Sequence, residues 1–190
     1  MTDLVEPSAV RHLSAAELAA ALPSIGSPRG SGTVEMVVRR PRTDAREELE
    51  VGVLDAAVGL AGDDWKDLPS SATPDRSPHP GRQLTLMNSR FVDLVAGSRD
   101  RWALAGDQLF VDLDLSFEAL PEGTTLRVGT ATVEITDQAH TGCAKFAARF
   151  GRDAHKLVWS EEGRALRLRG VYARVVTPGE VRPGDAIAVV

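Results

Sequence analysis

Short β-strand patterns separated by glycine and proline extend from Thr33 to Val190. Residues 33–40 alternate apolar and polar side chains, which is the pattern of a strand with one buried face, and residues 49–54 repeat it. Further segments of this kind lie at 83–87, 109–117, 125–128, 131–136, 167–176 and 186–190. Such spacing is typical of a β-barrel.

The length of 190 residues fits one compact domain with a short appendage, because one hydrophobic core serves a domain of about 100–200 residues. A hydrophobic fraction of 43% excludes the apolar-poor composition of disordered proteins. We therefore predict an N-terminal helix with a Gly/Ser/Pro linker at residues 1–32 and a barrel domain at 33–190. The expected fold class is mostly β with peripheral helices (α+β).

Three helices are predicted from capping patterns. Ser14 and Glu17 match a capping box, which predicts a short helix to about residue 22 at the periphery of the domain. Asn88 caps a predicted helix near 88–97, and Thr141 caps another over 141–150 that Gly151 ends.

A long loop is expected at residues 62–82, because this stretch has four prolines and almost no apolar periodicity. Loops of this length inside compact domains are either functional lids or mobile segments, and the sequence leaves both readings open.

The net charge of −5 predicts no general attraction to nucleic acid or to an anionic membrane surface. A single cysteine excludes an intrachain disulfide and favours a reducing compartment. We found no signal-peptide pattern at the N-terminus and no apolar run long enough for a membrane span. We therefore expect a cytoplasmic protein with neither nucleic-acid nor membrane partners.

Cys143 is the main candidate for chemistry. Its predicted place in the first turn of the 141–150 helix favours a thiolate, because free amide groups and the helix dipole stabilise an anion there. His140 and Lys145 are expected to add to this effect, with His140 as a ligand or proton shuttle. Cys143 then acts as a nucleophile or as a soft-metal ligand.

The same residues also have structural explanations. For Cys143 a structural role is as well supported as a functional one, and for His140 it is the more common case. Cys143 shares a helical stripe with Phe146 and Phe150, and free cysteines are often buried. A lone His140 at a strand end is more often a surface or capping residue.

A basic segment lies between His140 and Arg174, where eight Lys/Arg accompany three Asp/Glu in an otherwise acidic chain. Arginine binds phosphate in a bidentate manner, so the segment favours a phosphate-bearing ligand, although a solvated helix face is the usual explanation for such spacing. We expect at least two of four arginines to line one pocket near Cys143, namely Arg82, Arg149, Arg164 and Arg169.

An ordered set of short segments resembles the MOSC domain, named for the C-terminal part of molybdenum cofactor sulfurases. The segments are Gly62-Asp63, Gly81–Asn88, Gly106–Leu109, Leu126–Gly129 and Cys143. The resemblance implies a β-barrel of the pyruvate-kinase type and an essential cysteine that carries sulfur or ligates molybdenum, which falls on Cys143. The chain has Gly142 before this cysteine, where relatives often have proline.

The resemblance implies binding of molybdenum cofactor (molybdopterin), with Cys143 as the metal ligand and reduction of N-hydroxylated compounds as the chemistry of the cofactor. The residues expected to hold the cofactor are Arg82, Asn88, Arg149, Arg164 and Arg169. A redox partner is then expected. The alternatives are a sulfur carrier that receives a Cys143 persulfide from a sulfur donor protein, and a non-catalytic barrel with a structural cysteine.

Overall fold

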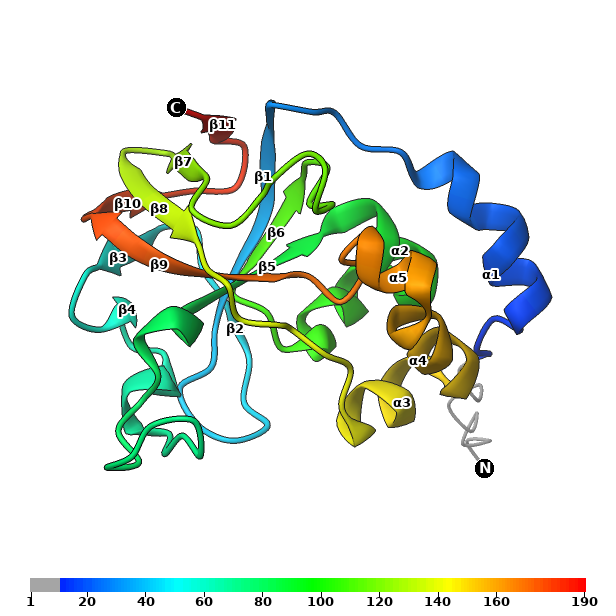
Figure 1. Ribbon diagram of the computed structural model, residues 1–190, viewed down its shortest axis with the longest axis horizontal. Coiled ribbons are helices and arrows are strands. Elements are labelled where there is room, and N and C mark those ends of the chain that lie inside the picture. Colours follow the sequence, from blue (N-terminus) through cyan, green and yellow to red (C-terminus); the bar gives the residue numbers. More distant parts are fainter. Residues whose placement is uncertain (1–10) are drawn as a thin grey trace, which may run out of the picture.

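Seven strands close into a barrel in the computed structural model, which describes residues 11–190 (Figure 1). Around the barrel the order is β1 (Ser31–Arg39), β11 (Ala186–Val189), β7 (Thr125–Val128), β8 (Ala131–Ile135), β9 (Val171–Thr177), β5 (Leu84–Asn88) and β6 (Leu109–Asp112). The pair β1–β11 closes the ring, with Ser31 opposite Ala188, and only β5–β6 is parallel. Closure leaves no unpaired edge in the ring.

Smaller strands extend the barrel at two places. Strand β2 (Glu47–Glu48) pairs with the end of β1. Strands β3 (Gly52–Asp55), β4 (Gly59–Leu60) and β10 (Gly179–Val181) form a separate three-stranded sheet.

Strand alternation explains why the barrel has a filled interior. In β8 the burial alternates strictly, with Ala131, Val133 and Ile135 buried and the residues between them partly exposed. Aliphatic side chains from all seven ring strands meet in this way in one core cluster. The predicted mostly β fold with peripheral helices is confirmed.

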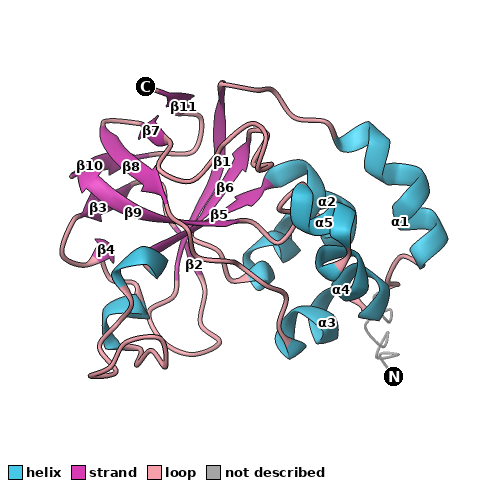
Figure 2. Ribbon diagram, viewed as in Figure 1, coloured by secondary structure: helices cyan, strands magenta, loops and turns pink. Residues whose placement is uncertain are grey.

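Helices cover one side of the barrel and enclose a second core (Figure 2). The strands on this side are buried on both faces: in β5, Leu86 belongs to the barrel interior and Met87 to the helical core. In β6, Leu109 and Phe110 divide in the same way. The helices are α1 (Ala15–Ala21), α2 (Ser89–Ala96), α3 (Ala144–Phe150), α4 (Arg152–Trp159) and α5 (Glu161–Ala165), with a 3₁₀ segment at Arg99–Ala105.

Two of the predicted caps are confirmed. Ser14 and Glu17 form the capping box of α1, and the Asn88 side chain accepts a hydrogen bond from the Phe91 amide at the start of α2. Helix α1 is less peripheral than expected, because Leu18 is fully buried in the helical core and the Ala15 amide donates to Asp153 of α4.

The third predicted cap is wrong. Helix α3 begins at Ala144, and Cys143 is its N-cap residue with an extended backbone, so Thr141 lies outside the helix. Cys143 is therefore not in the first helical turn. Within residues 11–190, no helix has the length and apolar character that a membrane span requires.

Candidate functional site

A cleft of about 320 Å³ lies between the 62–82 loop and the outer face of the β5–β9 pair, where Thr85 and Tyr172 alternate with residues of the barrel core. The loop forms one wall through Trp65, through residues 68–71 and through His79. The lining contains three arginines and two histidines but no Asp or Glu, so the cleft is cationic although the chain has a net charge of −5. The remaining lining residues are Arg40, Arg82, Thr85, Gly106, His140, Arg169 and Tyr172.

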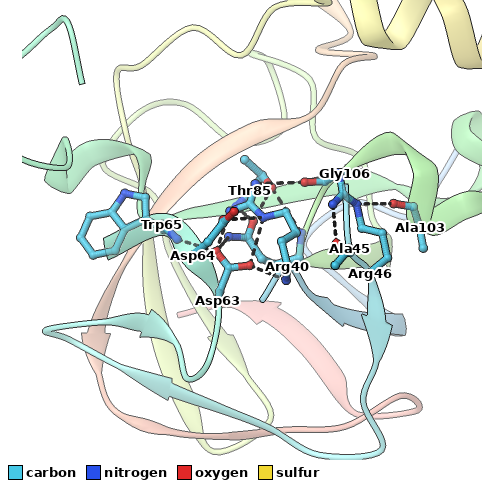
Figure 3. A network of polar contacts seen from close by, with 10 residues as sticks. Arg40, Ala45, Arg46, Asp63, Asp64, Trp65, Thr85, Ala103 and Gly106 are labelled. Atoms are coloured by element: carbon cyan, nitrogen blue, oxygen red, sulfur yellow. Dashed lines mark hydrogen bonds and ion pairs between the residues drawn. The ribbon is translucent and has the colours of Figure 1, made fainter. Parts of the chain in front are cut away.

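Arg40, which directly follows β1, fixes the start of the loop to the barrel (Figure 3). Its guanidinium donates to both carboxylate oxygens of Asp63 at 3.0 and 2.7 Å and to the Gly106 carbonyl oxygen at 3.1 Å. Burial opposes the charge of Arg40, but the hydrogen bonds that it donates to Asp63 raise the pKa of Arg40 above the ordinary value. Arg40 is therefore a fixed positive charge at the rim of the cleft.

Asp63 is the centre of this network and has no further room for ligand contacts. Its side chain is 1% exposed, and it also accepts hydrogen bonds from the Trp65 amide and the Gln108 side-chain amide. The neighbouring Asp64 has one buried oxygen without a hydrogen bond, and burial raises its pKa.

Arg169 reaches the cleft from the segment before β9 and is anchored by Asp107. Arg169 Nη1 donates to both Asp107 oxygens at 2.8 and 3.0 Å, and Nη2 donates to the Ala105 carbonyl oxygen at 3.0 Å. Burial raises the pKa of Asp107, which is 0% exposed, whereas the Arg169 charge lowers it. The third nitrogen of the guanidinium, Nε, is buried without a hydrogen-bond partner.

His140 lies beside this pair with its ring against Tyr172, at a centroid separation of 4.5 Å. Its Nδ1 atom is 3.6 Å from Asp107 Oδ1 and is buried without a hydrogen bond. Burial, followed by the charges of Arg169, Arg40 and Arg82, lowers the pKa of His140 well below its ordinary value of 6.5. The imidazole is therefore neutral at neutral pH.

Gly170 allows the chain to pass between Leu86 and His140. Gly170 has a φ of +96°, and a side chain there would meet the Leu86 carbonyl oxygen at 2.3 Å and approach His140 Nδ1 to 3.4 Å. The close packing of β5 and the start of β9 beneath His140 thus requires glycine.

A second, smaller hollow of about 130 Å³ adjoins the cleft. His140 and Arg169 line both spaces, so these two side chains lie where the spaces meet. Phe117 and Trp159, which are 58% and 44% exposed, and Arg164 also line the smaller hollow.

Of the five residues predicted to bind the cofactor, three line the cleft or the smaller hollow and two do not. Arg82 and Arg169 line the cleft, and Arg164 with Arg169 lines the smaller hollow. Arg82 is oriented by Gln138, which accepts from its Nε at 3.1 Å, and it lies over the Tyr172 ring.

Two predicted cofactor residues have structural partners elsewhere. Asn88 caps α2, and its amide nitrogen donates to Ser27 and to the Leu113 carbonyl oxygen, next to a different pocket. Arg149 donates to the Leu104 carbonyl oxygen and to Asp44. Neither residue lines the cleft or the smaller hollow.

The predicted catalytic group around the cysteine is not assembled as expected. Cys143 is exposed, Lys145 pairs with Asp44 at 2.8 Å, and His140 faces Asp107. The thiol is not among the residues that line the cleft, although His140 lies only three positions earlier in the chain. Among residues 11–190, no cluster of three or more His, Cys, Asp or Glu side chains is arranged to hold a metal ion.

Three residues of the site were not anticipated from the sequence. Arg40 follows an ordinary strand, and Tyr172 is an alternating strand residue, so neither had a distinguishing local pattern. Asp107 belongs to the Gly106–Leu109 segment, which is one of the segments that resemble the MOSC domain. This resemblance was the feature of the sequence from which Asp107 could have been chosen as a site residue.

The chain matches the family model described as MOSC domain over residues 78–188. Among solved structures, the YuaD protein from Bacillus subtilis has a TM-score of 0.58 and 19% identity, covering 86% of this chain and 98% of its own. YiiM from Geobacillus stearothermophilus has a TM-score of 0.57 and 17% identity, covering 84% and 75%. YiiM from Escherichia coli has a TM-score of 0.52 and 17% identity, covering 83% and 69%. At these identities the likeness concerns the fold, and no curated protein matches the chain.

Proposed function

Since the chain belongs to the MOSC domain family, we propose that it binds molybdenum cofactor, with the cofactor phosphate in the cationic cleft and with Cys143 as the thiolate ligand of the metal. When bound, the cofactor supplies the reduction of N-hydroxylated compounds, and a redox partner supplies the electrons. The observation that carries this proposal is the lining of the cleft, where three arginines and no acid face the same space.

The donor set of the cleft fits a phosphate-bearing ligand. Arg82 and Arg169 offer guanidinium groups, and the buried Nε of Arg169 has no hydrogen-bond partner in the protein. Unpaired buried donors are costly, and an anion would satisfy such a group. A volume of about 320 Å³ is at the lower end of the range for small-molecule sites.

Each side chain then has a separate task. Arg82, held by Gln138, and Arg169, held by Asp107, bind and orient the anionic group. Arg40 holds the loop that forms one wall of the cleft. Cys143 provides a soft donor suited to molybdenum, three positions after the cleft residue His140.

The test is metal analysis of protein produced in a host that synthesises the cofactor. We expect near-stoichiometric molybdenum and pterin in the wild-type protein and at least a tenfold loss in Arg82→Gln. The matched control is Arg152→Gln, which removes an exposed arginine outside the cleft lining and should leave loading unchanged. Wild-type protein without molybdenum would refute the proposal.

Cys143→Ser tests the role assigned to the thiol. Serine keeps the size of the side chain but removes the soft donor, so we expect loss of molybdenum. Because the cleft arginines remain, a molybdenum-free pterin should still bind. Full molybdenum loading in this variant would place the metal ligand elsewhere.

A second candidate function is sulfur carriage, which the exposure of Cys143 favours. An exposed thiol outside the cleft lining is accessible to a sulfur donor protein, which would leave a persulfide on Cys143. Mass spectrometry of the intact protein after incubation with a desulfurase and cysteine measures this modification. A persulfide on the wild-type protein without bound molybdenum would favour this function over cofactor binding.

A further inference from the structure

We propose that Asp107 positions His140 as a neutral hydrogen-bond acceptor, with Nδ1–H directed at Asp107 and with Nε2 unprotonated for a bound molecule. His140 would then select ligands that present an N–H or O–H donor where the cleft and the smaller hollow meet. This inference shares one premise with the proposed function, namely that the cleft binds a ligand. Asp107 is a positioning residue, because it acts through His140.

The first observation is the pairing of a buried carboxylate with a buried imidazole nitrogen. Asp107 is 0% exposed, the His140 side chain is 8% exposed, and 3.6 Å separate Oδ1 from Nδ1. Nδ1 has no hydrogen bond, and a buried polar atom without a partner costs about 1–3 kcal/mol. Because hydrogen bonds in ligand sites are often long before the ligand binds, a small movement of the ring suffices to form this one.

The second observation is the set of charges that faces the ring. Arg169, Arg40 and Arg82 all disfavour an imidazolium at this position, and the pKa of His140 is lowered accordingly after the effect of burial. Two further titratable groups lie against the ring, Asp107 and Tyr172, and burial raises the pKa of both. The two spaces that His140 lines also contain His79, Glu122, Asp137, Arg164 and Arg167. The ring is therefore neutral and carries a single N–H.

The position of that hydrogen follows from Asp107. Burial raises the pKa of Asp107, whereas the two hydrogen bonds that it accepts from Arg169 favour the carboxylate form, in which Oδ1 retains acceptor capacity. An unprotonated Nδ1 would place its lone pair against this oxygen, which is repulsive. The hydrogen is therefore expected on Nδ1, and Nε2 keeps the free lone pair.

The third observation is that the ring is held in place. Tyr172 packs on it at a centroid separation of 4.5 Å, and the backbone at Gly170 passes close to Nδ1, since a Cβ there would lie 3.4 Å from this atom. With Nδ1 enclosed, the ring presents its other edge to the two spaces that it lines.

His140 thus lets the lining bind a hydrogen-bond donor of a ligand, which the arginines cannot do. Arginine side chains only donate hydrogen bonds, so Arg40, Arg82 and Arg169 cannot accept a hydrogen bond from an N–H or O–H group of a ligand. His140 Nε2 supplies an acceptor among these donors. Sites built around such a bond strongly reject analogues that lack the matching group.

The experiment is NMR of the wild-type protein labelled with ¹⁵N, in which long-range ¹⁵N–¹H spectra report the protonation of each imidazole nitrogen. The His140 signals are assigned by their absence in His140→Gln. We expect the Nδ1–H tautomer, with no conversion to the charged form between about pH 8 and pH 5. An Nε2–H tautomer or an imidazolium at pH 7 would overturn the proposal.

Variants of Asp107 test the positioning role. Asp107→Asn should introduce the Nε2–H tautomer, whereas Asp107→Glu, which keeps the carboxylate, should retain the Nδ1–H form. Asp112→Asn is the control, because the partly buried Asp112 pairs with Arg90, lines neither space and should not affect His140. These spectra need no bound cofactor, so their outcome is separate from that of the molybdenum analysis.

Discussion

At the residue scale, the cleft depends on buried groups whose charges are set by their neighbours. His140 lies among three arginines and Asp107 lies under Arg169, so changing one of these charges alters the others. The neutrality of His140 therefore has a consequence for stability as well as for binding.

The folded protein should lose stability as the pH falls below the ordinary histidine pKa of 6.5. An unfolded chain takes up a proton at His140 in this range, but the folded state resists it because the pKa is lowered there. From this residue alone, the free energy of unfolding should thus decrease as the pH falls below 6.5, with a slope that approaches about 1.4 kcal/mol per pH unit. Urea denaturation at several pH values measures it.

Two variants isolate the histidine. His140→Gln should remove this part of the slope, whereas His12→Gln, which replaces an exposed histidine, should keep it. Asp107 contributes to the pH slope of the free energy of unfolding with the opposite sign, because its raised pKa favours proton uptake by the folded state. The slopes of the wild type and of each variant are therefore compared with one another. Equal slopes in the wild type and in His140→Gln would contradict the buried neutral imidazole.

Single residues were the hardest feature to predict from the sequence. Cys143 was identified by its neighbourhood, but its exact backbone position depends on where α3 begins, and α3 starts one residue later than the cysteine. The contacts of Arg40 with Asp63 and of Asp107 with Arg169 join positions far apart in the chain. Local patterns carry no information about such pairs.

At the element scale, the 62–82 loop is the part whose role the structure clarifies most. It contains two 3₁₀ turns, at Asp64–Asp67 and Pro80–Arg82, and it forms a wall of the cleft. Its first end is fixed by the Arg40–Asp63 pair and its last end by Arg82 with Gln138. The sequence left open whether this loop is a functional lid or a mobile segment. A lid requires the Arg40–Asp63 and Arg82–Gln138 contacts to hold the loop in place, whereas a mobile segment does not.

Asp63→Asn should detach the first end of the loop. The change removes the hydrogen-bonded anionic partner of the largely buried Arg40 and leaves only Asp64 at 3.9 Å, so it should cost up to about 3 kcal/mol of the free energy of unfolding. Trypsin should then cleave faster after the exposed Lys66 and Arg76. Unfolding in urea and the rate of cleavage at these two sites measure both effects.

The neighbouring exposed pair offers a control at the same end of β1. Arg39 and Glu47 are 39% and 45% exposed, so Glu47→Gln should cost less than about 1 kcal/mol and leave the cleavage rate unchanged. If Asp63→Asn behaves like Glu47→Gln, the loop does not depend on the buried pair.

Elements with strong local signals were predicted well, and the others were not. The alternation at 125–128 and 131–136 predicted β7 and β8, and the Asn88 cap predicted α2. Helices α4 and α5 were missed, because Gly151 was interpreted as the end of helical structure. The strand predicted at 167–176 begins only at Val171, as β9. Gly151 instead links two helices with a φ of +96°.

At the scale of the whole molecule, the barrel and the helices share strands and should unfold together. Strands β1, β5 and β6 contribute to both cores, so neither core is complete without the other. Of the three tryptophans, Trp102 lies in the helical core, where it is 6% exposed, and replacing Trp65 and Trp159 by phenylalanine makes it the single fluorescence reporter. Ile187 of the closing strand β11 belongs to the barrel core.

Ile187→Ala should destabilise both cores equally. Ile187 of β11 is 0% exposed, and its truncation leaves a cavity that costs about 2–4 kcal/mol. Far-ultraviolet circular dichroism and tryptophan fluorescence should report the same lowered midpoint. Val189→Ala, at a position 43% exposed on the same strand, should cost less than about 1 kcal/mol. Separate midpoints for the two signals would show that the cores are independent.

The pairing of β1 with β11 also determines the order in which the protein can form on the ribosome. Ser31 leaves the exit tunnel long before its partner Ala188 has been translated. Pairs that join such distant positions form slowly, and until then one edge of β1 remains free to pair with other extended chains. The nascent barrel therefore stays open until Ala186–Val189 emerges, and chaperone protection matters most during this interval.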